Sequence, residues 1–125
     1  MNGRLSTHVL DTARGRPAAG VAIALWYLGS SSNPEQSGGD AVLVARATTN
    51  TDGRTDAPLL ADGTMRTGAW RLVFGVGDYY RAGRHPDAGA FLERVAIEFR
   101  IADIEAAYHV PLLVTPWSYS TYRGS

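Results

Sequence analysis

Short segments of alternating apolar and polar residues divide this sequence, and clusters of glycine, proline, asparagine and aspartate separate them. An alternation with a period of two places every second side chain on the same face of a β-strand. Residues 68–76 show it most clearly, because Trp70, Leu72 and Phe74 fall on one face. Seven or eight such strands joined by turns predict an all-β fold, an antiparallel β-sandwich. The predicted strands are residues 5–11, 21–28, 41–49, 68–76, 92–101, 108–114 and a last strand that starts at Tyr119.

Two features interrupt the strand pattern. Residues 77–84 predict one or two helical turns, with Asp78 near the helix N-terminus, where a carboxylate is favourable. Pro111 lies inside the predicted strand 108–114 and has no amide hydrogen to donate. We therefore expect that strand to lie at an edge of its sheet or to contain a bulge.

The composition limits the classes of function. A length of 125 residues predicts one domain, residues 1–125. Twelve basic side chains balance twelve acidic ones, which argues against nucleic acid as a partner. The absence of cysteine excludes disulfides and thiolate chemistry, and the longest apolar run is too short to cross a membrane. We expect a cytoplasmic protein that has no membrane partner.

Three positions carry groups suited to acid–base chemistry or to binding a polar ring. His8 and His109 each lie within a predicted strand beside a valine, and imidazole titrates near neutral pH. Arg54 follows the tight-turn signal Asp52-Gly53, and a guanidinium can orient a planar amide or stabilise an oxyanion. No spacing rule connects these positions, so the residues alone leave their association open.

The C-terminal segment has an unusual character for a chain end. Chain ends are usually polar and frayed, whereas Tyr119, Thr121 and the following Tyr122 give this segment strand-forming residues. It finishes with Arg123-Gly124-Ser125. We therefore interpret the tail as a functional element.

Other kinds of site lack their sequence signals. No His-Glu-x-x-His motif or paired histidines indicate a metal, and no Gly-x-Ser-x-Gly motif indicates a serine nucleophile. The segment Gly75-Val76-Gly77 lacks the third glycine of a dinucleotide-binding fingerprint. We expect no metal and no cofactor.

Four segments together resemble a known family. Residues 5–12 (LSTHVLDT), followed by 15–20 (GRPAAG), resemble the opening signature of the transthyretin-like 5-hydroxyisourate hydrolases. Residues 49–54 (TNTDGR) and 108–113 (YHVPLL) resemble the second and third motifs of that family. Residues 119–125 (YSTYRGS) match the terminal motif that separates the hydrolases from the hormone carrier transthyretin.

The resemblance implies a fold and an assembly. The fold is a transthyretin-like antiparallel β-sandwich of two four-stranded sheets with one short helix. The assembly is a homotetramer, a dimer of dimers, with active sites where two dimers meet.

The resemblance also implies an activity and its residues. The substrate is 5-hydroxyisourate, and the product is 2-oxo-4-hydroxy-4-carboxy-5-ureidoimidazoline, formed by a histidine-activated water in urate catabolism. The implied catalytic residues are His8, Arg54, His109 and Ser125. The implied substrate-binding residues are His8, Arg54, Tyr122, Arg123, Gly124 and Ser125.

Three departures and two alternatives accompany this resemblance. Ser118 stands where the family commonly has glycine, residues 90–92 (AFL) replace Phe-Phe-Pro, and the loop 29–40 is longer and more polar than typical. The first alternative function is a non-catalytic, transthyretin-type protein that binds a small ligand. The second is a structural sandwich that assembles through its edge strands.

Overall fold

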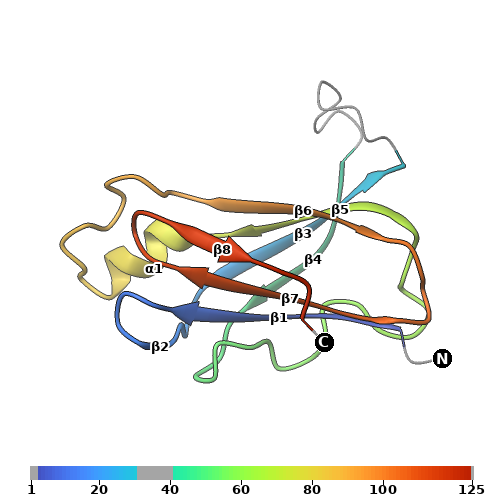
Figure 1. Ribbon diagram of the computed structural model, residues 1–125, viewed down its shortest axis with the longest axis horizontal. Coiled ribbons are helices and arrows are strands. Elements are labelled where there is room, and N and C mark those ends of the chain that lie inside the picture. Colours follow the sequence, from blue (N-terminus) through green and yellow to red (C-terminus); the bar gives the residue numbers. More distant parts are fainter. Residues whose placement is uncertain (1–2, 31–40, 125) are drawn as a thin grey trace.

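Two four-stranded sheets packed face to face form the architecture seen in the computed structural model, which describes residues 3–30 and 41–124 (Figure 1). The strand orders are β2-β1-β7-β8 and β4-β3-β5-β6. This arrangement confirms the predicted sandwich with one short helix. The elements are β1 Arg4–Asp11, β2 Arg16–Pro17, β3 Ala22–Gly29, β4 Val42–Thr48, β5 Gly68–Phe74, α1 Val76–Ala82, β6 Val95–Ile101, β7 Ala107–Val114 and β8 Tyr119–Thr121.

One strand pair departs from the antiparallel pattern. β1 and β7 run parallel, in a register that extends from Arg4 opposite Ala107 to Asp11 opposite Val114. The other strand pairs in the two described sheets are antiparallel. A hairpin forces two strands to be antiparallel, but β1 and β7 are joined through the whole second sheet, so no turn sets their direction.

Pro111 lies in an inner strand, and the prediction of an edge strand or a bulge there was wrong. β7 is paired on both sides, with β1 and with β8. The ladder between β7 and β8 covers Leu112 to Val114, so Pro111 lies just beyond it. The Thr121 hydroxyl donates to the Pro111 carbonyl (2.7 Å). The missing amide hydrogen therefore falls at a position where β8 has already left the ladder.

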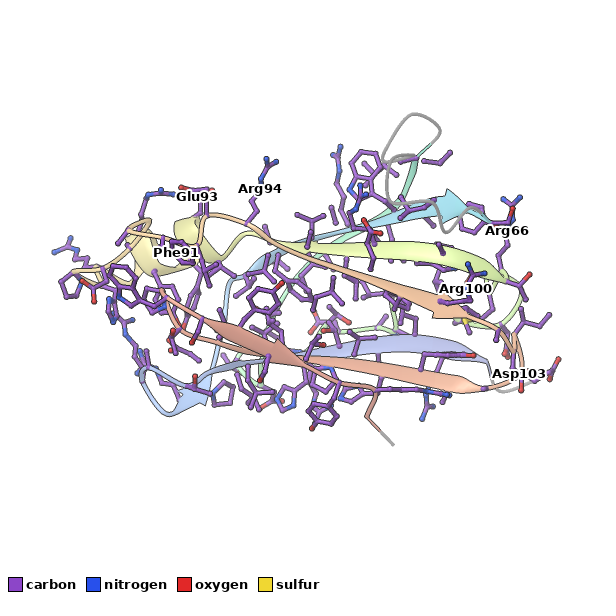
Figure 2. The ribbon with its side chains drawn as sticks, turned by 45° about the horizontal axis from the view of Figure 1, so that its top comes forward. Arg66, Phe91, Glu93, Arg94, Arg100 and Asp103 are labelled. Carbon is purple, nitrogen blue, oxygen red and sulfur yellow. The ribbon has the colours of Figure 1, made fainter. Side chains whose placement is uncertain are left out.

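The core lies between the sheets and consists of every second residue of the long strands (Figure 2). Leu5, Val9 and Leu112 of one sheet meet Leu72 and Phe74 of the other, and all five are fully buried. The residues between them face outward from each sheet. The alternation predicted from sequence therefore leaves two outer faces that are free to carry functional groups.

Helix α1 is attached to the end of β1 through a buried carboxylate. Asp11 is fully buried and accepts hydrogen bonds from the hydroxyls of Tyr79 (2.7 Å) and Tyr80 (2.8 Å) and from the Arg14 amide (3.1 Å). Burial, followed by the bond to Asp11, raises the pKa of Tyr79 to about 12 and raises that of Tyr80 further. Both hydroxyls therefore stay protonated and serve as donors to the carboxylate.

No helix in the described part of the chain is both long enough and apolar enough to span a bilayer.

Candidate active site

The outer face of β1 and β7 brings the two strand histidines together. Ser6 and His8 alternate with buried residues along β1, and His109 does the same on β7. The parallel register sets Ser6 opposite His109 and His8 opposite Pro111, so the two histidines are diagonal neighbours. We call the surface formed by Ser6, His8 and His109 the histidine face.

His109 is held by a side chain of the adjacent strand. The Ser6 hydroxyl lies 2.8 Å from His109 Nδ1, where either atom can serve as donor according to the histidine tautomer. Burial lowers the pKa of His109, and the positive charges of Arg54 and His8 lower it further. His109 is therefore held in its neutral form near pH 7, the form that can accept a proton.

His8 is held by a main-chain carbonyl. Its Nε2 lies 2.8 Å from the Asp52 carbonyl oxygen, which can only accept a hydrogen bond. Nε2 therefore carries the proton, and neutral His8 has its free lone pair on Nδ1.

Arg54 reaches this face because the preceding turn is attached to β1. The Asn50 side-chain oxygen accepts from the amides of Asp52 (2.9 Å) and Arg54 (3.2 Å), which closes the turn. The Gly53 carbonyl accepts from the Val9 amide (2.7 Å), and a bridge pairs Arg54 with His8. The guanidinium is exposed, and its charge acts on His109.

Gly53 must be glycine for this turn to approach β1. Its φ is +75°, a region that other residues rarely adopt, and a Cβ would lie 2.3 Å from the Val9 carbonyl oxygen. The Asp52-Gly53 pair that predicted a tight turn thus also places Arg54.

The C-terminal tail lies along β7 and ends beside His109. The Gly124 amide donates to the His109 carbonyl (2.7 Å), and a Cβ on Gly124 would lie 2.6 Å from His109 Cδ2. Gly124 therefore borders the imidazole ring directly. Ser125, predicted to be catalytic and substrate-binding, lies outside the described residues.

The other two tail residues differ in their surroundings. The Arg123 guanidinium lies 4.1 Å from the centre of the Tyr108 ring and donates to the Ala107 carbonyl (3.1 Å). It thereby attaches the tail to the start of β7. Tyr122 is 61% exposed. Within one chain the structure thus brings together His8, Arg54, His109 and Gly124, while Arg123 contacts Tyr108.

A shallow hollow of about 240 Å³ opens beside the histidine face and is lined in part by Arg4, Ser6 and Arg54. Among the described residues, no group of three or more histidine, aspartate or glutamate side chains is placed to hold a metal ion. His85 lies apart from this site, because its Nδ1 accepts from the Asp87 amide (3.0 Å) and its ring packs against Tyr80.

Sequence reasoning missed Ser6 and Asn50. Ser6 is two residues before His8 in an alternating strand, so their shared face was available from the pattern. The position of Ser6 opposite His109 could not be predicted from the pattern, because the pairing of β1 with β7 has no local sequence signal. Asn50 belongs to the second motif, where an asparagine before Asp-Gly is typical of a side chain that closes a turn.

Together these groups form a set suited to hydrolysis. The site offers an imidazole kept neutral at neutral pH, a second imidazole with a defined tautomer, and an exposed guanidinium beside both. Such a set can take a proton from water and stabilise charge that develops on a carbonyl oxygen.

Comparison with known proteins finds a family that matches almost the whole chain. The model of the HIUase/Transthyretin family matches residues 5–124. A 5-hydroxyisourate hydrolase of Halalkalibacterium halodurans is 47% identical over 126 residues, which cover all of both chains.

Two solved structures share the fold. The 5-hydroxyisourate hydrolase of Klebsiella pneumoniae is 31% identical with a TM-score of 0.73, over 98% of this chain and 99% of that one. The structure of an (S)-allantoin synthase is 40% identical with a TM-score of 0.84. The match covers 99% of this chain and 44% of the synthase chain, so this chain spans less than half of that protein.

Proposed function

This chain belongs to the HIUase/Transthyretin family, and from that premise we propose that it is an enzyme that hydrolyses 5-hydroxyisourate. The observation that carries the proposal is the convergence of His8, Arg54 and His109 on one outer sheet face. Relatives that match over 95% or more of their length are named for this activity. The activity would place the protein in urate (purine) degradation.

In the proposed reaction, one water opens the ring. A histidine takes a proton from the water as its oxygen bonds to the ring carbonyl carbon. The carbon–nitrogen bond of the ring then breaks, and the departing nitrogen receives a proton. The product is 2-oxo-4-hydroxy-4-carboxy-5-ureidoimidazoline, and no redox partner or cofactor is needed.

We assign the base to His109 or His8 acting on that water, with Arg54 orienting the substrate and stabilising the tetrahedral oxyanion. The low pKa of His109 supports its role as a proton acceptor near neutral pH. The exposed guanidinium of Arg54 beside His8 supports contact with substrate.

The tail is assigned to the rim of the same site. Tyr122, Arg123 and Gly124 are proposed to bind substrate, and Ser125 to orient the substrate or a histidine through its hydroxyl or carboxylate. The contact of Gly124 with His109 supports a tail that sets the position of the ring. Arg123 supports this position of the tail, because its guanidinium donates to the Ala107 carbonyl and packs on the Tyr108 ring.

We also propose that the enzyme works as a homotetramer, a dimer of dimers. The histidine face is an outer sheet face, and a second copy against it would exclude bulk water from the reacting groups. Light scattering coupled to gel filtration tests the assembly; a catalytically competent monomer contradicts it. Cytoplasmic location stays a prediction.

The test of activity is the loss of 5-hydroxyisourate absorbance after the compound has been generated with urate oxidase. A hydrolase speeds the loss in proportion to its concentration. A transthyretin-type carrier slows it or leaves it unchanged, and a structural sandwich has no effect. The histidines of the histidine face and the neighbouring Arg54 favour the enzyme, because a carrier needs no proton acceptor.

A further inference from the structure

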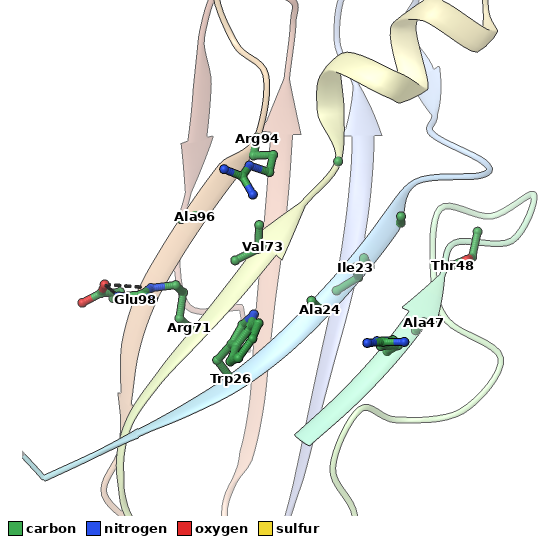
Figure 3. A pocket seen from close by; sticks show the side chains of 13 residues that line it. Ile23, Ala24, Trp26, Ala47, Thr48, Arg71, Val73, Arg94, Ala96 and Glu98 are labelled. Atoms are coloured by element: carbon green, nitrogen blue, oxygen red, sulfur yellow. Dashed lines mark hydrogen bonds and ion pairs between the residues drawn. The ribbon is translucent and has the colours of Figure 1, made fainter. Parts of the chain in front are cut away.

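The outer face of the second sheet carries a groove that the hydrolase proposal does not use. Its volume is about 910 Å³, and it lies across β4, β3, β5 and β6 (Figure 3). This sheet is packed on the opposite side of the core from the histidine face. We call this hollow the arginine groove, because Arg46, Arg71 and Arg94 are among its lining residues.

Small apolar side chains form the floor of the arginine groove. The strand registers align Arg46, Ala24, Val73 and Ala96 in one row across the four strands. Outer sheet faces of sandwiches are normally polar, whereas three of the four side chains in this row are aliphatic. A flat molecule can therefore lie close to the pleated backbone along this row.

A second row closes one end of the arginine groove. Trp26 is opposite Arg71, and Arg71 is opposite Glu98. Arg71 donates through Nε (3.0 Å) and a terminal nitrogen (2.7 Å) to one oxygen of Glu98. Figure 3 shows the Trp26 indole beside Arg71 at this end of the floor. The half-buried indole gives the groove an aromatic wall.

The described lining carries three arginines and one glutamate, so its charge is positive. Glu98 already neutralises Arg71. The excess charge comes from Arg46 at the β4 side and Arg94 just before β6. Figure 2 shows Arg94 extending outward from the sheet, away from the core.

We propose that the arginine groove binds a flat aromatic anion of two or three fused rings with one carboxylate or sulfonate. Four strands at about 4.8 Å spacing give a floor about 14 Å wide, which matches such a ring system. The rings pack on the alanine and valine floor against Trp26, and the anionic group pairs with Arg46 or Arg94. Ligand sites of this kind are mostly apolar, with a few placed charges.

The probe for this site is 2-naphthoate, added to the full-length protein while backbone amides are followed by NMR. We expect saturable shifts at Ala24, Val73 and Ala96, with a dissociation constant on the order of 1 mM or below. Binding should weaken as salt is added, and the uncharged 2-naphthamide should bind more weakly.

Matched variants separate binding in the arginine groove from general attraction of the anion to arginines elsewhere on the surface. Arg46→Gln and Arg94→Gln should each weaken 2-naphthoate about twofold to fivefold, the range for one exposed ion pair. Arg100→Gln also removes one positive charge, but Arg100 lies on β6 past Glu98 and does not line the groove. This variant should leave the affinity for 2-naphthoate unchanged. Trp26→Leu should weaken binding about threefold or more through lost stacking.

The proposal is overturned if 2-naphthoate shows no saturation, if 2-naphthamide binds equally well, or if Arg100→Gln has the same effect as Arg94→Gln. Shifts confined to Ser6 and His109 also contradict it, because they place the probe on the histidine face. If Trp26→Leu folds poorly, the arginine variants alone decide the result. All four variants are expected to hydrolyse 5-hydroxyisourate at the wild-type rate. Either this proposal or the hydrolase proposal can therefore be contradicted without the other.

Discussion

The main-chain amide of Gly124 donates to the carbonyl of His109 at 2.7 Å, and a Cβ added to Gly124 would lie 2.6 Å from Cδ2 of the His109 ring. This relationship joins the end of the chain to a histidine on an inner strand. It places the tail at the border of the histidine face, while the Arg123 guanidinium packs on the Tyr108 ring.

Gly124→Ala should disturb the His109 ring without unfolding the protein. The added Cβ would lie 2.6 Å from Cδ2, so the ring or the tail must shift. A shift near 1 Å in a catalytic group costs about 10²-fold in rate. We expect kcat/KM for 5-hydroxyisourate to fall by that order while Tm changes little. Gly75→Ala is the matched control, since its Cβ meets only ordinary contacts at 3.6 Å; equal activity of the two variants would exclude this role for the tail.

Ser6→Ala removes the hydroxyl 2.8 Å from His109 Nδ1 and leaves the ring free to rotate or change tautomer. We expect kcat to fall about tenfold, the factor that a hydrogen bond worth about 1.4 kcal/mol represents. Ser6 is a positioning residue, so KM should change less than kcat and Ser6→Thr should restore part of the rate. Ser120→Ala, an exposed hydroxyl on β8, is the control. A loss that appears in KM alone would indicate direct contact with substrate instead.

Burial is the first cause of the lowered pKa of His109, and the charge of Arg54 lowers it further. Because that charge lowers the pKa of His109, Arg54→Gln should raise it and move the acid limb of kcat/KM to higher pH. Arg54→Lys keeps the charge and should leave the pKa lowered. NMR titration of the His109 ring measures the change directly. The account is wrong on this point if the Gln and Lys variants titrate alike.

The same pKa predicts how stability depends on pH. Folding holds the pKa of His109 below its ordinary value of 6.5, so below that value the unfolded chain binds more protons. The resulting loss of unfolding free energy is absent above pH 6.5. It grows as the pH falls and is complete below the pKa of His109 in the folded protein. His109→Gln should therefore flatten the fall in unfolding free energy in this window, as measured by urea denaturation at several pH values. A slope equal to that of the wild type would contradict the assignment.

Tyr80→Phe tests the attachment of α1. The fully buried Tyr80 hydroxyl lies within hydrogen-bond distance of Asp11 and of the Val114 carbonyl, and its loss leaves buried acceptors with fewer donors. We expect a loss of about 1–3 kcal/mol in unfolding free energy by chemical denaturation. Tyr79→Phe removes the other donor to Asp11 from a less buried ring and should cost less. The reverse order would show that Tyr80 is not the main attachment.

Local pattern was sufficient to predict the helix and the described strands other than the two-residue β2 (Arg16–Pro17), because alternation and turn residues act within a few positions. The helix predicted at residues 77–84 lies at Val76–Ala82, a shift of one to two residues. Sequence pattern also placed His8 and His109 within strands, as the structure has them. These features needed no knowledge of the rest of the chain.

Long-range pairing was not available from the residues alone. The parallel contact of β1 with β7 joins segments about a hundred positions apart, and it determines both that Ser6 meets His109 and that Pro111 is internal. The association of the site residues was first indicated by the resemblance to a family. The hydrogen bonds of Tyr79 and Tyr80 to Asp11 could not be predicted from sequence either. They form only because α1 packs against the end of β1 in the folded chain.

The measurement that bears most directly on the central claim follows 5-hydroxyisourate by absorbance and its product by circular dichroism, for the wild type and for His8→Gln, Arg54→Gln and His109→Gln. We predict that the wild type speeds the loss and gives an optically active product, whereas spontaneous hydrolysis gives a racemate. Each variant should lose about 10²-fold or more in rate while keeping its Tm. Wild-type protein that leaves the rate and the racemic product of buffer unchanged, or three variants as active as the wild type, would contradict the account.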